Sequence, residues 1–237
     1  DAAARIVRSF SGLPLVIVGD VMLDQFVVGR VNRISPEAPV PVVEFEHDEY
    51  RAGGAANVAT NARSLGGEVE LVGLIGRDQA GERLVQELAG RSIGAGGLVC
   101  DGDRRTTTKL RIVTSRNQQV ARVDYETDEE VAGRIEAAII AQVRRAAGRA
   151  KVIVVSDYLK GVVSQGVMSA IIQIAAERRI PVLVDPKIPH IGYYRGATLV
   201  TPNHHEAEVA AHMRIRTPDD AARAASVFKE RVGCRSV

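Results

Sequence analysis

The fold is decided by Lys151-Val152-Ile153-Val154-Val155-Ser156-Asp157, a run of β-branched residues that stops at a hydroxyl and a carboxylate. A strand that is apolar without polar alternation is typical of a sheet covered on both faces, as in parallel α/β sheets. Polar residues that follow such a strand lie at the carboxyl edge of the sheet, where ligands bind. We therefore predict a buried parallel strand over residues 152–155.

Four more short apolar runs resemble this stretch. They cover residues 15–18, 70–75, 182–184 and 198–200, and the polar ends that follow three of them are Gly19-Asp20, Asp185-Pro186-Lys187 and Thr201-Pro202-Asn203. Between the runs, apolar residues recur at helical spacing over residues 131–143, 167–175 and 221–228. This alternation predicts an α/β fold with a doubly wound, mainly parallel sheet and helices on both faces.

Two segments, about 21–50 and 104–125, lack helical periodicity. Residues 40–46 read as a half-polar strand, and residues 106–113 and 119–123 read as a hairpin around Ser115-Arg116-Asn117. We predict that both segments form one small β layer that projects from the sheet as a lid. The whole chain, residues 1–237, is expected to be a single domain with this appendage.

Composition excludes several classes of protein. The chain has 46% hydrophobic and 25% charged residues with a net charge of +2, which fits a globular protein and excludes a strongly basic nucleic-acid binder, although a local basic site is compatible with it. Only 4% of the residues are aromatic, so a stacking platform for bases is not expected. The two cysteines, Cys100 and Cys234, favour a reducing, cytoplasmic location, and no apolar run is long enough to cross a membrane. Walker A, Gly-x-Gly-x-x-Gly and Gly-x-Ser-x-Gly motifs are absent.

Small residues begin one predicted helix at Gly53-Gly54-Ala55-Ala56-Asn57. They would let a ligand approach the backbone at a helix N-terminus, and Asn57 could bind hydroxyl groups. A tight turn packed beneath a helix explains the same residues equally well. Asp20 and Asp24, which follow the first strand, could accept bonds from sugar hydroxyls or simply form a turn and a helix cap.

Basic residues gather in the second lid segment. Lys109 and Arg111 would share one face of a strand, where they could bind a phosphate group, or they could guard a solvated edge strand. The residues alone favour the edge strand. Near the end of the sheet, Lys187 could bind a phosphate, and Asn203 and Glu206 could hold a magnesium nucleotide. We do not predict a metal site from His205, Glu208 and His212, whose spacing is not that of a known zinc motif.

The motifs together resemble the ribokinase-like (PfkB-type) carbohydrate kinases, and within them the bacterial heptose 7-phosphate kinases. The resemblance runs from about residue 13 to the C-terminus, and the segments that carry it are residues 18–24, 33–42, 53–59, 108–111, 115–119, 156–161, 185–187 and 194–198. The proline-rich segment 33–42 and the Arg-Asn-Gln-Gln motif at 116–119 are specific to the heptose branch.

This resemblance implies a function and a set of site residues. The family transfers the γ-phosphoryl group of ATP, with Mg²⁺, to a sugar hydroxyl; in the heptose branch the acceptor is the anomeric hydroxyl of D-glycero-D-manno-heptose 7-phosphate, and the 1,7-bisphosphate feeds lipopolysaccharide synthesis. The nucleotide-binding residues would be Lys187, Asn203, His204, His205 and Glu206. The substrate-binding residues would be Asp20, Asp24, Gly53, Gly54, Asn57, Lys109, Arg111, Arg116, Asn117, Gln118, Asp157, Lys160 and Asp185.

One family motif is missing. The Gly-Ala-Gly-Asp loop, whose Asp deprotonates the acceptor hydroxyl in this family, does not occur in the sequence. We expect it beyond Val237, so that the chain is truncated and inactive by itself. A kinase for another sugar or nucleoside, or a non-catalytic sugar-phosphate sensor, remains an alternative. We also expect a homodimer formed through exposed edges of the lid.

Overall fold

The computed structural model of the protein describes residues 2–237. Its strands are β1 (Pro14–Gly19), β2 (Val21–Ile34), β3 (Pro41–Gly54), β4 (Glu68–Gly76), β5 (Gly94–Asp101), β6 (Thr108–Thr114), β7 (Gln119–Tyr125), β8 (Val152–Ser156), β9 (Val182–Asp185) and β10 (Leu199–Val200). Its helices are α1 (Ala2–Arg8), α2 (Ala55–Ser64), α3 (Gln79–Ala89), α4 (Gly133–Ala146), α5 (Gln165–Arg178), the 3₁₀ helix η1 (Ile188–Tyr194), α6 (His204–Ala211) and α7 (Pro218–Val232).

Six strands form the central sheet in the order β10-β9-β8-β1-β4-β5, and every neighbouring pair is parallel. The sheet contains all five strands predicted from apolar runs. It also contains β5, which the sequence did not indicate because its first half, residues 94–97, is three glycines and an alanine. From β1 the chain adds strands first toward β5 and later toward β10, so the winding direction reverses beside β1. Such a reversal creates a crevice at the carboxyl edge.

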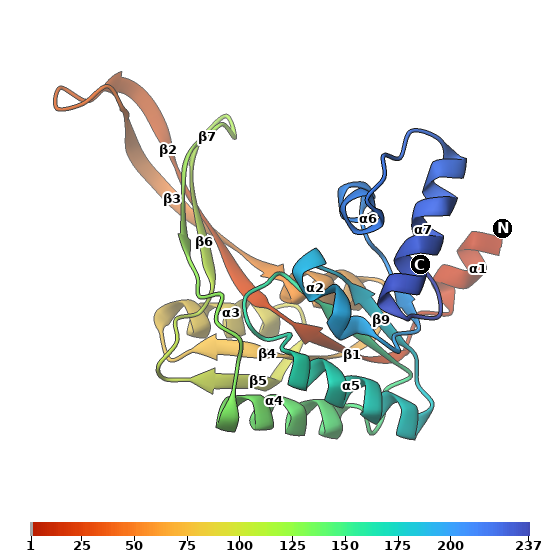
Figure 1. Cartoon of the computed structure of the whole chain (residues 1–237). Helices are drawn as coiled ribbons and strands as arrows, with labels where there is room; N and C mark the ends of the chain where they lie inside the picture. Colours follow the sequence, from red (N-terminus) through yellow and green to blue (C-terminus); the bar gives the residue numbers. More distant parts are fainter. Residues whose placement is uncertain (1) are drawn as a thin grey trace.

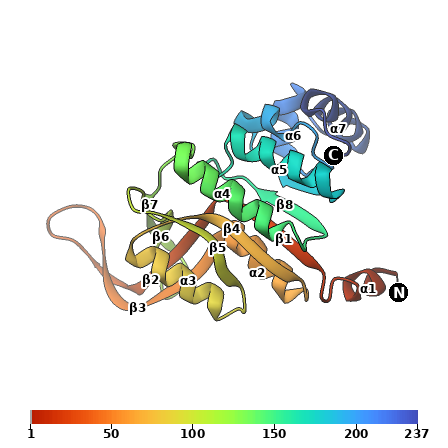
Figure 2. The ribbon, with the colours of Figure 1, turned by 90° about the horizontal axis from the view of Figure 1, so that it is seen from below.

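Helices cover both faces of this sheet, which explains the continuous apolar strands (Figures 1 and 2). Within β1, Val16 and Val18 pack into a core with α4 and α5, whereas Ile17 packs into a second core with α2 and α3. Because successive strand residues point to opposite faces, a strand buried on both sides must be apolar throughout. The predicted α/β, doubly wound fold is thus confirmed, and α4, α5 and α7 occupy the three segments with helical periodicity.

A second, four-stranded sheet has the order β3-β2-β6-β7. The pairs β2–β3 and β6–β7 are antiparallel hairpins, and β2 and β6 run parallel. Figure 1 shows the β2–β3 ribbon rising far from the central sheet. We call this four-stranded sheet the lid sheet. The chain passes directly from the central sheet into the lid sheet, because only Asp20 separates β1 from β2.

A buried hydrogen-bond cluster fixes the lid sheet to the core at Asp78. The Asp78 carboxylate caps α3 by accepting a bond from the backbone N–H of Gly81. It also accepts bonds from the backbone N–H and the hydroxyl of Thr106, at 2.9 and 2.7 Å. Thr106 in turn accepts a bond from the backbone N–H of Gly76 at the end of β4. Thr106 lies two residues before β6, so this cluster anchors the point where the chain enters the lid sheet.

Between residues 2 and 237 the structure has no helix of the length and apolarity needed to cross a lipid bilayer.

Candidate functional site

The carboxyl ends of β1, β8, β9 and β10 meet at one edge of the central sheet, and the lid sheet begins there (Figure 1). Two clusters of polar side chains occupy this edge. One lies at the β9–β10 end and holds most of the predicted nucleotide-binding residues. The other lies on the lid sheet and holds several of the predicted substrate-binding residues.

The first cluster is built around Glu206. Its backbone N–H donates to the Asn203 side chain at 2.9 Å, and its carboxylate accepts the Asn203 N–H at 2.9 Å, which makes a capping box at the start of α6. The other carboxylate oxygen accepts a bond from Lys187 Nζ at 2.6 Å. The predicted trio of Lys187, Asn203 and Glu206 is therefore brought together. Asn203 and Glu206 also cap α6, so their mutual bonds are explained by the helix start as well as by a binding site.

Electrostatics at this end favour a cation. Asp185 lies half-buried beside Lys187, and burial together with the nearby carboxylates of Glu206 and Asp157 raises its pKa despite the lysine. For Lys187, burial opposes the charged form, but the bond to Glu206 outweighs it and the pKa is raised. The lysine ammonium also lies 5.7 Å from the centre of the Tyr158 ring.

The two histidines of this segment are on the surface. His204 and His205 are both exposed, and His204 Nε2 lies 3.5 Å from a carboxylate oxygen of Glu208. In the described part of the chain no group of three or more His, Cys, Asp or Glu side chains is arranged to hold a metal ion.

The glycines of the 53–57 motif bring the backbone close to its neighbours. A Cβ on Gly53 would lie 2.7 Å from the Asp24 carboxylate, and one on Gly54 would lie 2.2 Å from the Asp20 carbonyl oxygen. Gly54 also has a φ of 55°, the left-handed region that favours glycine. Asn57 is exposed in the first turn of α2, whose N-cap has no side-chain bond. The motif therefore places a helix N-terminus that has no side-chain cap beside Asp24.

A row of alternating charges crosses the lid sheet at the level of Asp24. Arg51, Asp24, Lys109 and Asp124 are successive cross-strand partners on β3, β2, β6 and β7. In the next row, Phe26 is opposite Arg111, and the guanidinium groups of Arg51 and Arg111 lie 4.6 and 5.2 Å from the centre of its ring. Residues two apart on a strand share a face. One face of the lid sheet therefore carries all these groups, including the predicted Asp24, Lys109 and Arg111.

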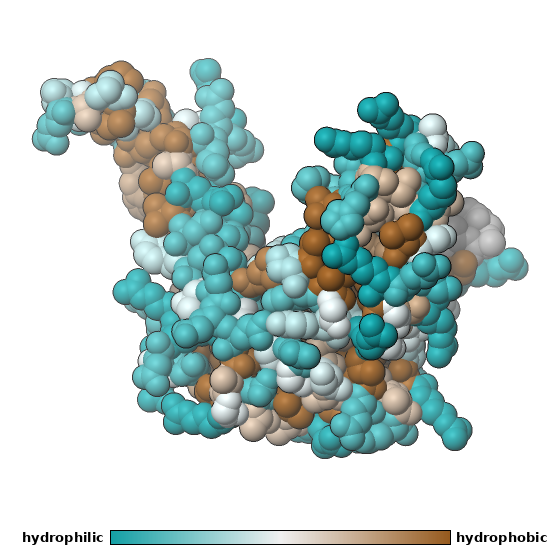
Figure 3. Space-filling view, viewed as in Figure 1, coloured by the Kyte–Doolittle hydropathy of each residue, from teal (hydrophilic) through white to brown (hydrophobic). Residues whose placement is uncertain are grey.

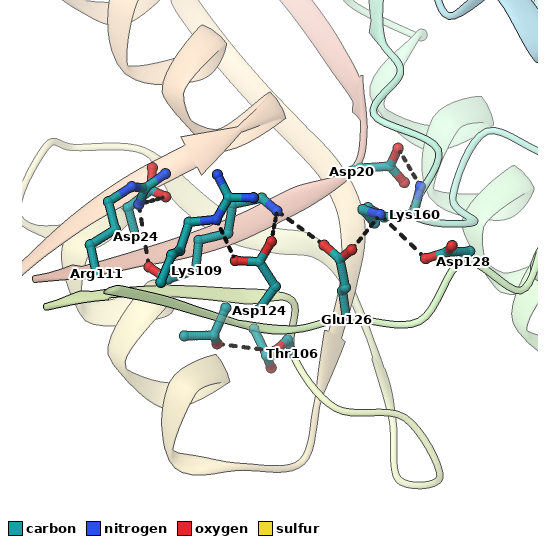
Figure 4. Close-up of polar contacts among 11 residues, drawn as sticks. Asp20, Asp24, Thr106, Lys109, Arg111, Asp124, Glu126, Asp128 and Lys160 are labelled. Carbon is teal, nitrogen blue, oxygen red and sulfur yellow. Dashed lines mark hydrogen bonds and ion pairs between the residues drawn. The ribbon is translucent and has the colours of Figure 1, made fainter. Parts of the chain in front are cut away.

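Ion pairs link this face to the core (Figure 4). Arg111 Nη1 donates to Asp24 at 2.5 Å, and Lys109 Nζ donates to Asp124 at 3.2 Å and to Glu126 at 3.0 Å. Lys160, in the loop after β8, donates to the other oxygen of Glu126 at 2.9 Å. Burial lowers the pKa of Lys160, but its bonds to Glu126 and Asp128 outweigh this and raise it. Asp24, Lys109, Arg111 and Lys160 thus form one charged surface.

Asp20 does not belong to that surface. Its side chain is buried, and its two oxygens accept bonds from the backbone N–H groups of Tyr158, Lys160 and Val162 at 2.7, 3.1 and 2.9 Å. Burial, and to a smaller degree the charge of Asp157, raises its pKa. A carboxylate with these partners is not placed to bind a sugar hydroxyl. The contact that we expected is replaced by a structural role, in which Asp20 shapes the loop that carries Lys160.

Asp157 is a second correction of the same kind. It is fully buried and accepts bonds from Tyr194 Oη at 2.7 Å, His190 Nδ1 at 2.6 Å and the backbone N–H of Leu159 at 2.8 Å. Leu159 has a φ of 57°, so this bond helps to hold an uncommon backbone conformation. The position of Asp157 after a strand predicted an exposed carboxylate, but η1 folds over it.

The turn of the β6–β7 hairpin is separate from the charged surface. Arg116 and Gln118 are exposed and line a hollow with Arg30 on the outer part of the lid sheet. Asn117, with a φ of 59°, lines another hollow of about 310 Å³ together with Phe26 and Arg51. Within one chain, the structure therefore brings Asn117 toward the charged face but leaves Arg116 and Gln118 away from it.

Several residues of the site were missed by sequence reasoning. Arg51 and Phe26 belong to the charged face, and Glu126 joins its two lysines. Strand alternation could have placed Arg51 on the face of Gly53. Glu126 had a weaker signal: four of the five residues from 126 to 130 are acidic and directly follow the basic hairpin.

A larger hollow, of about 780 Å³, lies on the opposite face of β2 and β3. Its lining includes Gln25 and Tyr50, which alternate with Asp24 and Arg51 along the strands, and Arg83 of α3. Because it lies on the other face of the lid sheet from Asp24 and Lys109, it is not the site described above.

Known proteins resemble this chain along most of its length. The pfkB family of carbohydrate kinases matches residues 14–234. The chain is 44% identical over 226 residues to the bifunctional protein HldE of Citrifermentans bemidjiense, covering 94% of this chain and 46% of that protein. It is 45% identical over 221 residues to HldE of Azorhizobium caulinodans, covering 93% and 46%. The chain thus spans about half the length of these relatives.

Solved structures show the same fold at low identity. Phosphofructokinase-2 of Escherichia coli, in its tetrameric inhibited form, superposes with a TM-score of 0.72 at 19% identity, over 94% of this chain and 71% of that one. Ribokinase of Arabidopsis thaliana, in complex with ribose and ATP, superposes with a TM-score of 0.68 at 16% identity, over 94% and 70%. Matched along nearly its whole length, this chain belongs to the pfkB family of carbohydrate kinases.

Proposed function

We propose that the protein transfers the γ-phosphoryl group of ATP to the anomeric hydroxyl of D-glycero-D-manno-heptose 7-phosphate, a step toward lipopolysaccharide precursors. The observation that carries this proposal is the pairing of two clusters at one edge of the sheet. Lys187 and Glu206 suit a nucleotide, and Asp24, Arg111 and Lys109 suit a sugar that already bears an anion. The identity to HldE proteins and the sequence motifs of the heptose branch support the choice of sugar.

The order of the clusters gives the substrate a direction. The nucleotide cluster lies at the β9–β10 end of the edge, the 53–57 glycine motif begins α2, and the cationic face lies beyond it on the lid sheet. A sugar with its acceptor hydroxyl toward ATP would place hydroxyls beside Asp24 and a terminal phosphate among the cations of the lid-sheet face. Such an arrangement orients both reactants, which is the main task of a phosphoryl-transfer site.

Mg²⁺ is expected as the partner of ATP in this family. Asp185 and Glu206 supply carboxylate oxygens, the ligand type that Mg²⁺ prefers, and Asp185 lies near the carboxylates of Glu206 and Asp157. These residues therefore fit the ion, which would neutralise charge on the transferred phosphoryl group.

The general base is not assigned to any residue of this sequence, because Gly-Ala-Gly-Asp does not occur in it. Asp20 and Asp157 are unsuitable, since both are buried and hydrogen-bonded. Residues 1–237 alone are expected to give no turnover. Detectable ATP-dependent phosphorylation by this polypeptide would contradict that expectation.

The test is a substrate panel with the intact protein, ATP and Mg²⁺. We expect the heptose 7-phosphate to give the highest kcat/KM, measured by coupled ADP release, with phosphorus NMR showing a new phosphate on the anomeric carbon. If unphosphorylated ribose, fructose or a nucleoside gives the higher kcat/KM, the protein is a kinase for another acceptor. Binding of the phosphoheptose without any turnover would indicate a sensor.

We also propose that the protein is a cytoplasmic homodimer joined through the lid sheet. Val31, Ile34, Val40 and Phe45 are exposed on the β2–β3 ribbon, at 37%, 61%, 52% and 62%, and Figure 3 shows apolar side chains gathered along it. A ribbon of this kind is normally covered by a partner. Light scattering should give twice the protomer mass, and Phe45→Glu should shift it toward the monomer; a wild-type monomer would refute the proposal.

A further inference from the structure

Glu126 lies immediately after β7 and bridges two lysines from different sheets (Figure 4). Its Oε1 accepts a bond from Lys160 Nζ at 2.9 Å and its Oε2 accepts one from Lys109 Nζ at 3.0 Å. Lys109 belongs to the lid sheet, and Lys160 belongs to the core loop that Asp20 shapes. One anion with two oxygens therefore links the lid sheet to the core.

The two ammonium groups are held in place before any ligand arrives. Their side chains are only 18% and 14% exposed, and the backbone N–H of Lys160 is fixed by the buried Asp20 carboxylate. Two fixed cations that converge on one pair of oxygens also meet the geometric requirement for binding a phosphate group. The carboxylate of Glu126 thus occupies a position that suits a phosphate.

A phosphate could not simply be added to this cluster. Lys109 and Lys160 already contact three carboxylates, those of Asp124, Glu126 and Asp128. Burial raises the pKa of Glu126, but its bonds to both lysines outweigh this and lower it, so the group is charged at neutral pH. A further dianion would be repelled by these charges. Binding therefore requires exchange with a carboxylate.

Glu126 is the carboxylate best placed to exchange. Asp124 lies within β7 and is the direct cross-strand partner of Lys109, whereas Glu126 lies in the irregular segment between β7 and α4. Asp128 contacts only Lys160 and is 76% exposed. Resting on the proposed function, we propose that Glu126 is a resident anion that occupies a two-lysine phosphate site and is displaced by the phosphate of the incoming sugar. The exchange would release the lid sheet from the core and would favour phosphorylated over unphosphorylated sugars.

The test compares Glu126→Gln with wild type in the intact protein by titration calorimetry. We expect inorganic phosphate and the heptose 7-phosphate to bind about three- to tenfold more tightly to the variant, because a competing ion pair of modest strength is removed. Unphosphorylated heptose should bind equally to both proteins. Glu129→Gln, a nearby exposed glutamate, is the matched control and should bind phosphate as wild type does. Weaker or unchanged phosphate binding by Glu126→Gln would overturn the inference.

A second measurement needs no variant. Hydrogen exchange of wild-type amides over residues 126–131 should accelerate at saturating inorganic phosphate, because displaced Glu126 no longer fixes that segment. Slowed or unchanged hydrogen exchange would contradict the displacement of Glu126 by phosphate. A failure of the proposed function can be distinguished from a failure of this inference. If the intact wild type fails to phosphorylate any sugar phosphate but Glu126→Gln still binds phosphate more tightly, the anion site stands and only the kinase assignment falls.

Discussion

Asp24 and Arg111 form an ion pair across β2 and β6, with Arg111 Nη1 2.5 Å from Asp24 Oδ1. The second oxygen of Asp24 faces Gly53, where a Cβ would lie only 2.7 Å away. Asp24 therefore divides the site into a side that faces the glycine motif and a side that faces the arginines. The Asp24 oxygen that faces Gly53 is the one that we expect to accept bonds from sugar hydroxyls, and the phosphate is expected among the cations of the same face.

Replacing Asp24 by Asn should damage catalysis more than folding. The variant loses a charged acceptor for sugar hydroxyls and leaves Arg111 without its partner, so we expect kcat/KM for the sugar phosphate to fall about 10- to 100-fold. Steady-state kinetics of the intact protein would measure this, and thermal unfolding should change little. Asp48→Asn is the matched control, since Asp48 is an exposed carboxylate beside Gln25 on the other face of the ribbon. Equal losses in both variants would contradict the role of Asp24.

Arg51→Gln should act on phosphorylated substrates alone. Arg51 lies beside Phe26 with Arg111, and its present partner, Glu49, contacts it at 2.9 Å on an exposed part of the strand. Loss of one positive charge from the face that attracts the phosphate should raise KM for the sugar phosphate about two- to fivefold and leave an unphosphorylated acceptor unaffected. Arg30→Gln removes a similar pair with Glu46 farther along the ribbon and serves as the control. The same KM change with both kinds of acceptor would rule out an electrostatic effect of Arg51 on the phosphate.

Lys187→Met should weaken nucleotide binding specifically. The lysine is the cation nearest to Glu206, at 2.6 Å, and it is the charged residue of this end that is best placed to meet a phosphate. We expect the affinity for ATP to fall about tenfold in calorimetric titrations, with sugar binding preserved. Lys151→Met, at an exposed position before β8, should behave as wild type. Unaltered ATP affinity in Lys187→Met would move the nucleotide away from this end of the sheet.

Asp78 should make stability depend on pH. Burial raises the pKa of its carboxyl group, but bonds from Thr106 and Gly81 outweigh this and lower it below 3.8. A lowered native pKa stabilises the folded state above the unfolded value, and this contribution is lost as the pH falls through the native pKa. Asp78→Ala should therefore reduce the free energy of unfolding at pH 7 by about 2 kcal/mol.

Denaturant unfolding of wild type and Asp78→Ala between pH 3 and 7 checks this prediction. The difference between the two proteins should be constant above about pH 5 and should shrink below about pH 4. Thr106→Val removes the hydroxyl that donates to Asp78 and accepts the Gly76 N–H, but it leaves the two backbone bonds to Asp78, so it should retain part of the pH dependence. A difference that grows as the pH falls would have the wrong sign and would refute the assignment.

Sequence reasoning succeeded for the strands of the central sheet and for the β6–β7 hairpin because both depend on local patterns. It did not find β5, whose glycines conceal its strand pattern, or the full length of β2, whose outer half is exposed and polar. For the site, position after a strand predicted Asp24 and Lys187, whose side chains are partly exposed, and equally Asp20 and Asp157, which are buried. Asp20 and Asp157 are distinguished from the other two by the segments that fold over them, and no local sequence pattern indicates such a tertiary contact.

The amino-acid sequence by itself determined the parallel, two-faced sheet, since a strand covered on both sides must be apolar throughout, and it determined the family through its motifs. Only the tertiary structure decided which charges meet. Lys109 and Lys160 are 51 positions apart in the chain, yet both bind Glu126, because the lid sheet brings β6 and β7 back over the loop after β8. Such pairing depends on chain topology and strand register, and short-range periodicity contains neither.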